Sequence, residues 1–480
     1  MHKIGKVPSS YVNFSIHVWF IILFAAGTGL FSPNPSITVA SILSLPCFVA
    51  LLWRRGEPAV LFFTVAIQWL EVTLKVFHAN ATGISVEALN LTMFPDVIEA
   101  KRAIGLGLIG LLVMAFGMRL GMRGMGVLES QRLRQDAAGF SLNRLWIAYL
   151  ISVALSIWLS MMSQKIYYLK QVFLTLANFR WVIFFILAYT VMYKRQKGIY
   201  LVLATLYEIL AGFTGYFSKF TYVLFVLFLA ITGIGYRPTY KNTIKLVLII
   251  GMGVFLASCW LAIRDEYRNF LNLGTKQQII LVSLKERFEK LGELFTATRG
   301  EDLRRGFNLL LARIAYVDMF GHVLKYVPEF VPHQRGLLWN HAIQHVIAPR
   351  LFFPEKPSLP SDSEMTMKFT GLRMASGEEG TSISMGYMAE SYIDFGIPGM
   401  FVPVLLLGFL WGFIFRFLVL NVQPRIFGYA LSVVVLIDTL GFGSNNVKLL
   451  GGVLTGLIVM AVASKFIVPL IYRSLTLSRR

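Results

Sequence analysis

The sequence predicts an all-α fold: a polytopic helical membrane protein of about twelve transmembrane helices with one large, partly helical extracytoplasmic loop. The first observation is composition, because 56% of the 480 residues are hydrophobic, only 15% are charged and the mean hydropathy is +0.65. A soluble protein of this size needs more polar surface than that. The second is a series of apolar runs of about 17–25 residues, the length that crosses a bilayer. Helices satisfy their own backbone hydrogen bonds in lipid, which favours helical spans.

Twelve apolar runs account for the predicted spans. They lie at about residues 12–31, 35–53, 57–76, 102–120, 144–163, 173–193, 198–217, 219–235, 244–263, 397–416, 426–443 and 449–471. The long stretch between the ninth and tenth runs divides the chain into three parts. These are an N-terminal bundle of about nine helices (1–262), an extracytoplasmic loop subdomain (263–396) and a C-terminal bundle of about three helices (397–480).

The basic residues set the orientation of these spans. With the N-terminus inside, the cytoplasmic side receives Lys3, Lys6, Arg54, Arg55, Arg119, Arg123, Arg132, Arg134, Arg144, Lys194, Arg195, Lys197, Arg237, Lys241, Lys245, Arg416, Arg425, Arg473, Arg479 and Arg480. The short outer turns carry few charges, so the positive-inside rule places both termini in the cytoplasm. The formal net charge of +20 is therefore mainly a topology signal, and no basic soluble module with aromatic platforms indicates nucleic-acid binding.

The two cysteines and the first span argue against a disulfide-stabilised protein, a cysteine metal site and a removable signal peptide. Cys47 and Cys259 both lie in predicted spans, so we expect neither a disulfide framework nor a cysteine-based metal site. The first span is too long, and too poor in a small-residue cleavage site, for a removable signal peptide.

The loop at 263–396 has 16 basic and 16 acidic residues and a composition typical of ordered structure. Leucine and phenylalanine recur every three or four residues in 277–300, which predicts an amphipathic helix. We expect a second, more buried helix at 306–327 and a third at 336–351. The stretch 352–382 is rich in proline, serine and glycine and reads as an irregular loop.

Charged residues inside spans are costly, so each is a functional candidate. Glu208 lies near the middle of the seventh span and either serves function or pairs with a basic side chain from another helix. Lys219 follows at the outer edge, where it meets a lipid phosphate or simply snorkels. Glu71 and Lys75 are four residues apart, and this spacing predicts an ion pair on one helical face.

Several loop residues suit an anionic ligand. Arg264 and Arg268 are one turn apart where the ninth span ends, and Arg350 precedes the stretch "LFFPEK". Arg313 interrupts an apolar helix, so it either pairs with an acid such as Asp318 or contacts a ligand. Guanidinium groups match phosphate oxygens, particularly at a partly desolvated site.

Acids and histidines complete the set of candidates. Glu390 and Asp394 stand at the outer surface, just before the tenth span. His341 and His345 are four apart and could face one metal, but the pattern "HAIQH" lacks the glutamate of "HExxH" and a third ligand. We therefore expect no metal and no cofactor. "GxSxG" and "GxxxxGKS" are absent, so covalent hydrolysis and ATP-driven transport have no motif support.

These residue types fit inverting glycosyl transfer from a lipid diphosphate. Such a reaction needs a base to activate the acceptor hydroxyl and cations to stabilise the departing diphosphate. It needs neither a nucleotide nor a metal.

Two short motifs extend this reading to a family. "RLFFPEKP" (350–357), followed by "SMGYMAESYIDFGIPG" (384–399), resembles the "FP-x-KP" and "GE-x-Y-x-(N/D)-FG" signatures of the bacterial oligosaccharide repeat-unit polymerases, the Wzy or O-antigen polymerase type. The twelve-span topology with a late outer loop is also similar. The sequence departs from the second signature, because Tyr-Met-Ala separates Gly386 from Glu390. The motifs cover about a tenth of the chain, and the topology covers all of it.

The resemblance implies a metal-independent, inverting glycosyltransferase of the GT-C type in the bacterial inner membrane. Its substrates would be undecaprenyl-diphosphate-linked oligosaccharides on the outer face, with membrane lipids, a chain-length regulator and a flippase as further partners. Glu390 would be the catalytic base. Arg264, Arg268, Arg313 and Arg350 would bind diphosphate, supported by Lys219, while Asp394, Glu208, His341 and His345 are secondary candidates.

Two alternatives remain beside the polymerase. A ligase, which moves finished glycan to another acceptor, uses the same site chemistry. A flippase or transporter for lipid-linked glycan would favour charges along a central path and inverted repeats. Here midplane charges are few and the two halves of the chain differ.

Overall fold

The computed structural model describes residues 16–90, 99–126, 129–166, 169–216, 220–235, 240–275, 279–348, 353, 355, 360–374 and 382–476. Helices make up most of this described part, which contains no β-strand and only one isolated bridge, between Phe140 and Thr476. The expected all-α class is therefore confirmed.

The N-terminal half is a succession of apolar helices with one polar helix, α5. Their bounds are α1 (Ile16–Gly29), α2 (Pro35–Leu52), α3 (Val60–Thr82), α4 (Ala100–Gly121), α5 (Glu129–Gly139), α6 (Leu142–Lys165), α7 (Lys170–Ala177), α8 (Phe179–Lys194), α9 (Gly198–Phe213), α10 (Phe220–Ile234) and α11 (Tyr240–Leu271).

The C-terminal half begins with shorter, more polar helices and ends in three apolar ones. Their bounds are α12 (Leu284–Ala297), α13 (Gly300–Ile314), α14 (Val317–Tyr326), α15 (Leu337–Ile347), α16 (Asp362–Thr370), α17 (Tyr387–Gly399), α18 (Phe401–Asn421), α19 (Arg425–Leu436), the 3₁₀ turn η3 (Ile437–Thr439) and α20 (Asn446–Leu475).

Eight helices or helix pairs in the described residues are long and apolar enough to cross a membrane, or nine if the bent pair α13–α14 is one span. These eight coincide with eight of the twelve predicted spans. The other four predicted spans fall on shorter helices: α1, α9, α10 and α19 have 14, 16, 15 and 12 residues. Composition identified these runs, but a turn or a 3₁₀ segment ends each helix early. The chain is thus a multi-pass helical protein.

Glycines let α4 and α18 pack with their backbones in contact. Gly117 and Gly121 on α4 face Gly408 and Gly412 on α18, so each helix has two glycines four residues apart. A Cβ on Gly412 would lie 2.1 Å from the carbonyl oxygen of Met118, which leaves no room for a side chain. Small residues at this spacing are typical of closely packed membrane helices.

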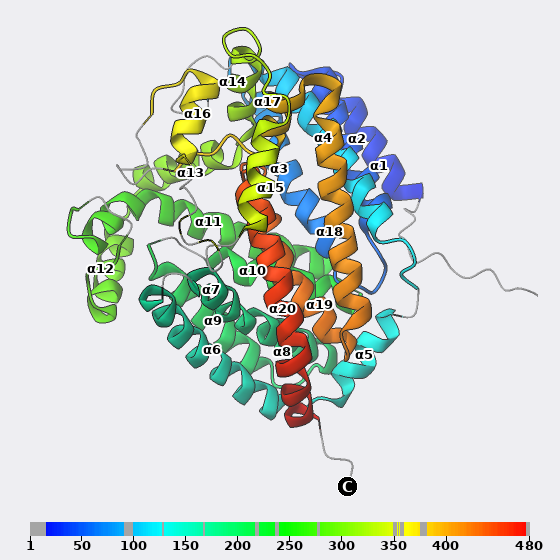
Figure 1. Cartoon of the computed structure of the whole chain (residues 1–480), viewed down its shortest axis with the longest axis vertical. Coiled ribbons are helices and arrows are strands. Elements are labelled where there is room, and N and C mark those ends of the chain that lie inside the picture. Colours follow the sequence, from blue (N-terminus) through cyan, green and yellow to red (C-terminus); the bar gives the residue numbers. More distant parts are fainter. Residues whose placement is uncertain are drawn as a thin grey trace, which may run out of the picture.

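The predicted loop is helical, as expected, but its segmentation differs in two places. The single helix predicted at 306–327 is wrong, because the chain bends by 52° between α13 and α14. The irregular reading of 352–382 is also wrong in part, since α16 lies within it. Figure 1 shows α14, α16 and α17 at one end of the molecule, with α5 and the C-terminal end of α20 at the other.

The predicted ion pair between Glu71 and Lys75 does not form. Lys75 instead donates to Asp318 of α14 at 2.7 Å, with both side chains 1% exposed. Glu71 accepts a hydrogen bond from the backbone N–H of Phe442. Both residues therefore bind elements that come together only in the folded chain, and Asp318 is not the partner of Arg313.

Candidate functional site

Glu390, the expected base, lies in the first turn of α17 beside the start of α20. Its Oε2 accepts a hydrogen bond from the backbone N–H of Asn446 at 2.8 Å, and its side chain is only partly buried. Gly386 precedes the helix with φ of 91°, a left-handed value that glycine adopts without strain. A Cβ there would lie 2.5 Å from the carbonyl oxygen of Phe442. The turn that positions Glu390 therefore requires glycine.

The surroundings of Glu390 favour its protonated form. Removal from water is the main cause, and it raises the pKa of Glu390 to about 8. The charges of Asp362 and Asp394 raise this pKa further, whereas the Asn446 N–H and the charge of Lys448 lower it. A carboxylate with a pKa in this range is a stronger proton acceptor than an ordinary glutamate once it is ionised.

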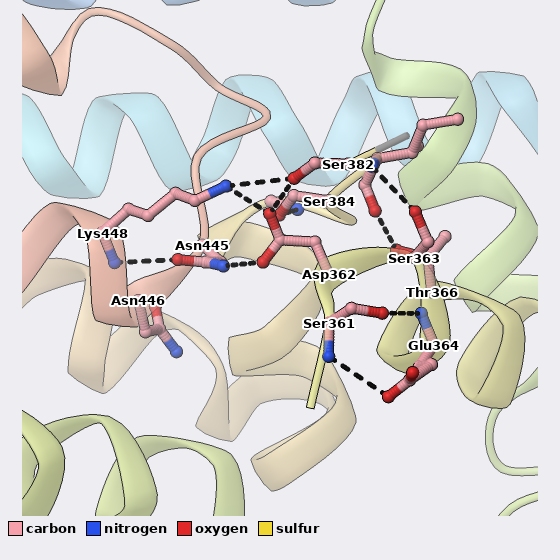
Figure 2. A network of polar contacts seen from close by, with 12 residues as sticks. Ser361, Asp362, Ser363, Glu364, Thr366, Ser382, Ser384, Asn445, Asn446 and Lys448 are labelled. Atoms are coloured by element: carbon pink, nitrogen blue, oxygen red, sulfur yellow. Dashed lines mark hydrogen bonds and ion pairs between the residues drawn. The ribbon is translucent and has the colours of Figure 1, made fainter. Parts of the chain in front are cut away.

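Asp362, the first residue of α16, connects three segments around this site (Figure 2). Its Oδ1 accepts from Asn445 Nδ2 at 2.6 Å, and its Oδ2 accepts from Ser382 Oγ at 2.7 Å. The ammonium of Lys448 forms an ion pair with the same carboxylate. One carboxylate thus joins α16, the segment before α17 and the first turn of α20.

Tyr316, at the bend between α13 and α14, connects this acidic region to the basic one. Its hydroxyl donates to the carbonyl oxygen of Ser384, three residues before α17 begins. Its ring lies so close to Gly443 that a Cβ there would be 2.4 Å away. The charges of Asp362 and of Arg313 both act on the phenol. Tyr316 therefore lies between the acids and the arginines.

The structure brings together three of the predicted arginines. Arg264 and Arg268 lie near the end of α11, and Arg313 lies at the end of α13, within the electrostatic range of both. α13 can approach α11 because Gly306 faces it, where a Cβ would lie 2.1 Å from the carbonyl oxygen of Ser258. Three like charges in one place repel one another, and an anion among them relieves that repulsion.

The three arginines differ in their partners. Arg264 Nε lies 2.9 Å from Oδ1 of the exposed Asp265. Arg268 Nε donates to the carbonyl oxygen of Tyr216 at 3.2 Å, and its guanidinium stacks over the Tyr216 ring at 4.9 Å. Arg313 is exposed and has no hydrogen bond or ion pair in the part of the chain that the structure describes. Arg313 is thus the most available cation of the three.

Asp394 has a structural place in the fold. Its two oxygens accept from the backbone N–H groups of Leu338 and Trp339 at 3.1 and 2.9 Å, which caps the N-terminus of α15. Burial raises the pKa of Asp394, and these two N–H groups oppose the rise. Because both oxygens are occupied, Asp394 is less suited than Glu390 to accept a proton.

Glu208 is buried away from Glu390, between three helices of the bundle. The Tyr149 hydroxyl of α6 donates to Oε1 at 3.1 Å, and Arg180 Nη2 of α8 lies 3.5 Å from Oε2. The pairing with a basic side chain from another helix is therefore confirmed. Glu208 holds helices together and is not brought to the candidate site.

The histidines form no metal centre with other residues. His341 and His345 both lie on α15, where the charge of His341 acts on Asp394. Within the described ranges, no three residues among histidine, cysteine, aspartate and glutamate are placed to hold a metal ion. Arg350 and Lys219, two further diphosphate candidates, lie outside the described residues.

Sequence reasoning missed Asp362, Tyr316, Asn446 and Lys448. A signal for the first was present, because Ser361 and Glu364 form a capping box at the start of α16. Asn445 caps α20 in the same way, accepting from the Lys448 N–H at 2.8 Å. Both caps indicate where a helix starts in the sequence, but neither indicates that the starts of α16 and α20 are in contact.

Comparison with curated proteins finds no match, and comparison with solved structures finds none either. A family model does match, over residues 112–469, and this region includes Glu390, Asp362 and the three arginines. The chain belongs to this family, whose description is "Domain of unknown function (DUF8712)".

Proposed function

We propose that the protein is a polymerase of exported bacterial polysaccharide, a metal-independent inverting glycosyltransferase. The observation that supports this best is that Tyr316 is within electrostatic range of both Arg313 and Asp362, and so connects the three arginines to the acidic network that includes Glu390. Cations for a departing diphosphate and a base for an acceptor hydroxyl thus lie on elements that Tyr316 connects. The short motifs around Glu390, which resemble the repeat-unit polymerases, support the same proposal.

The site suits the following reaction. The donor is the growing glycan on undecaprenyl diphosphate, and the acceptor is a single lipid-linked repeat unit. The acceptor hydroxyl attacks the anomeric carbon, the bond from that carbon to the diphosphate oxygen breaks, and Glu390 receives the hydroxyl proton. The arginines stabilise the negative charge that develops on the leaving diphosphate. Attack opposite the leaving group inverts the anomeric configuration.

The proposal also specifies the number of membrane crossings and the orientation of the protein. The short helices α1, α9, α10 and α19 complete twelve crossings of the bacterial inner membrane, with both termini cytoplasmic. The end of the molecule with α14, α16 and α17 then faces the periplasm or the exterior, where lipid-linked repeat units are presented. Accessibility labelling of single cysteines at Lys448 and at Arg134 tests this, and we expect only the former to react from outside.

The experiment that tests the function is the length distribution of surface and carrier-linked polysaccharide in a deletion strain. Single repeat units in place of long chains, restored by the wild-type gene, are expected for a polymerase. Long chains stranded on the carrier would identify a ligase instead. Repeat units trapped on the cytoplasmic leaflet would identify a flippase, and an unchanged profile would remove glycan assembly from consideration.

A further inference from the structure

The segment that leads into Glu390 is shaped by side chains of α16. Ser363 Oγ accepts from the backbone N–H of Ile383 at 3.2 Å, and Thr366 Oγ1 donates to the carbonyl oxygen of the same residue at 2.8 Å. Ser363 and Thr366 are both fully buried. Figure 2 shows these contacts beside those of Asp362 with Ser382. Both backbone polar groups of Ile383 are therefore fixed by α16 before the chain turns into α17.

The donor that holds Glu390 is fixed by the same helix. Glu390 binds the N–H of Asn446, the first residue of α20. Asp362 binds Asn445, the residue just before Asn446, through its amide, and Lys448, two residues after Asn446, through its ammonium. Moving α16 would thus displace the carboxylate of Glu390 and its hydrogen-bond donor together.

We propose that Asp362 and Lys448 form a positioning pair for Glu390, which fixes the start of α17 to the start of α20 and sets the charge around the Glu390 carboxylate. This inference rests on the proposed function, in which Glu390 is the base. Neither residue of the pair is proposed to contact the reacting atoms. Their part is to hold Glu390 in place and to balance its charge.

The charges around Glu390 allow an experiment to distinguish this pair from an ordinary structural contact. The charged groups that act on Glu390 are Asp362 on α16, Asp394 on its own helix and Lys448 on α20. Asp394 is engaged at the start of α15, beside His341, and α14 presents Asp318, already neutralised by Lys75. Asp362 and Lys448 act on Glu390 in opposite directions, so removing each charge should have opposite effects.

The test measures protonation of Glu390 without any glycan substrate. A hydrophobic carbodiimide labels protonated carboxyl groups, and peptide mass spectrometry of the purified full-length protein follows labelling at Glu390 against pH. We expect Asp362→Asn to lower the labelling midpoint by about one pH unit and Lys448→Met to raise it by a similar or smaller amount. Asp302→Asn, which removes an exposed carboxylate of α13 that is not among the charges acting on Glu390, should leave the midpoint unchanged.

Equal midpoints in wild type, Asp362→Asn and Lys448→Met would overturn the proposal, and so would shifts in the same direction. The Lys448 side chain is 59% exposed, so its replacement tests the pair even if the Asp362 variant does not fold. A second readout is glycan length, which should shorten in Asp362→Asn and not in Asp302→Asn. The labelling result stands independently of the function, because a normal glycan profile in a Glu390→Gln strain would refute the base assignment while leaving the midpoints intact.

Discussion

Two glutamates flagged by the sequence, Glu208 and Glu390, lie in very different surroundings. Glu208 is 1% exposed, and both of its oxygens face partners from other helices, Tyr149 and Arg180. Glu390 is partly exposed, has one backbone donor and is surrounded by further acids. A buried ion that is paired with a basic side chain contributes to the fold, whereas a partly exposed acid beside like charges is suited to exchange a proton.

The comparison extends to two arginines, Arg180 and Arg313. Arg180 is committed to Glu208 and lies over the Trp181 ring at 4.9 Å. Arg313 has no partner among the described residues and is next to two other arginines. The arginine beside Glu208 is therefore committed to an ion pair, whereas Arg313 is available to bind a ligand.

The largest expected effect separates the two glutamates. Glu390→Gln removes the base while keeping its volume, so we expect polymer formation to fall by about 10²–10⁴-fold with normal insertion and folding. Glu208→Gln should leave the rate within a few-fold and lower thermal stability. Glycan length in complemented deletion strains and unfolding temperatures in detergent measure the two effects. Near-normal polymer in the Glu390 variant would refute its assignment as the base.

Much of the fold and part of this comparison could be predicted from the sequence. Span-length apolar runs are a local property, so eight predicted spans coincide with long helices. Glu208 and Glu390 were identified because an acid within or next to an apolar run is costly wherever the chain goes. The grouping of Arg264, Arg268 and Arg313 could not be derived, because Arg313 reaches the other two only through the packing of α13 on α11.

Local spacing also misled where tertiary partners were stronger. Glu71 and Lys75 share a helical face, but an exposed pair of that kind contributes only about 0.3–0.5 kcal/mol. A buried lysine needs a close, desolvated partner, and Asp318 supplies it at 2.7 Å. Likewise, Asp362 lies in a stretch rich in proline and serine, where composition indicated a loop and only the capping box indicated a helix.

The next largest effects are expected from replacing the two arginines, Arg313 and Arg180. Arg313→Gln removes one cation from the candidate diphosphate site, so kcat/KM should fall by about 10–100-fold, the equivalent of one charge-assisted hydrogen bond, with little change in stability. Arg180→Gln should do the reverse, because it leaves Glu208 buried without its ion partner at a cost of about 3 kcal/mol. Initial rates with a lipid-linked substrate and unfolding temperatures distinguish them. A loss of stability without loss of rate at Arg313 would make it a structural residue.

The rate of the reaction should also depend on pH through Glu390. The pKa of Glu390 is raised to about 8 by burial, so the carboxyl group is mostly protonated at pH 7 and cannot accept the acceptor proton. Activity should therefore rise as pH increases and level off above about pH 8, falling about tenfold for each unit below. Steady-state rates in proteoliposomes from pH 5.5 to 9.5 measure this limb. Its presence in the Glu390→Gln variant would assign it to another group.

The smallest effect compares two tyrosine hydroxyls, one at each glutamate. Tyr316→Phe removes the hydrogen bond to the carbonyl oxygen of Ser384 but keeps the ring against Gly443. One neutral hydrogen bond contributes about 1 kcal/mol. If Tyr316 sets the spacing of the site, losing this bond should raise the activation free energy by about that amount and lower the rate a few-fold. Tyr149→Phe is the same chemical change at Glu208, and we expect it to lower stability with no change in rate.

Rates and unfolding temperatures of the two tyrosine variants together decide whether the bend between α13 and α14 belongs to the site. A slower Tyr316→Phe enzyme of unchanged stability means that this hydroxyl sets the spacing between the arginines and Glu390. Equal losses of stability in both variants, with rates unaffected, would mean that Tyr316 only packs the loop. In that case the arginines and the acids would be neighbours without being one site, and the contrast between Glu208 and Glu390 would rest on the two carboxylates alone.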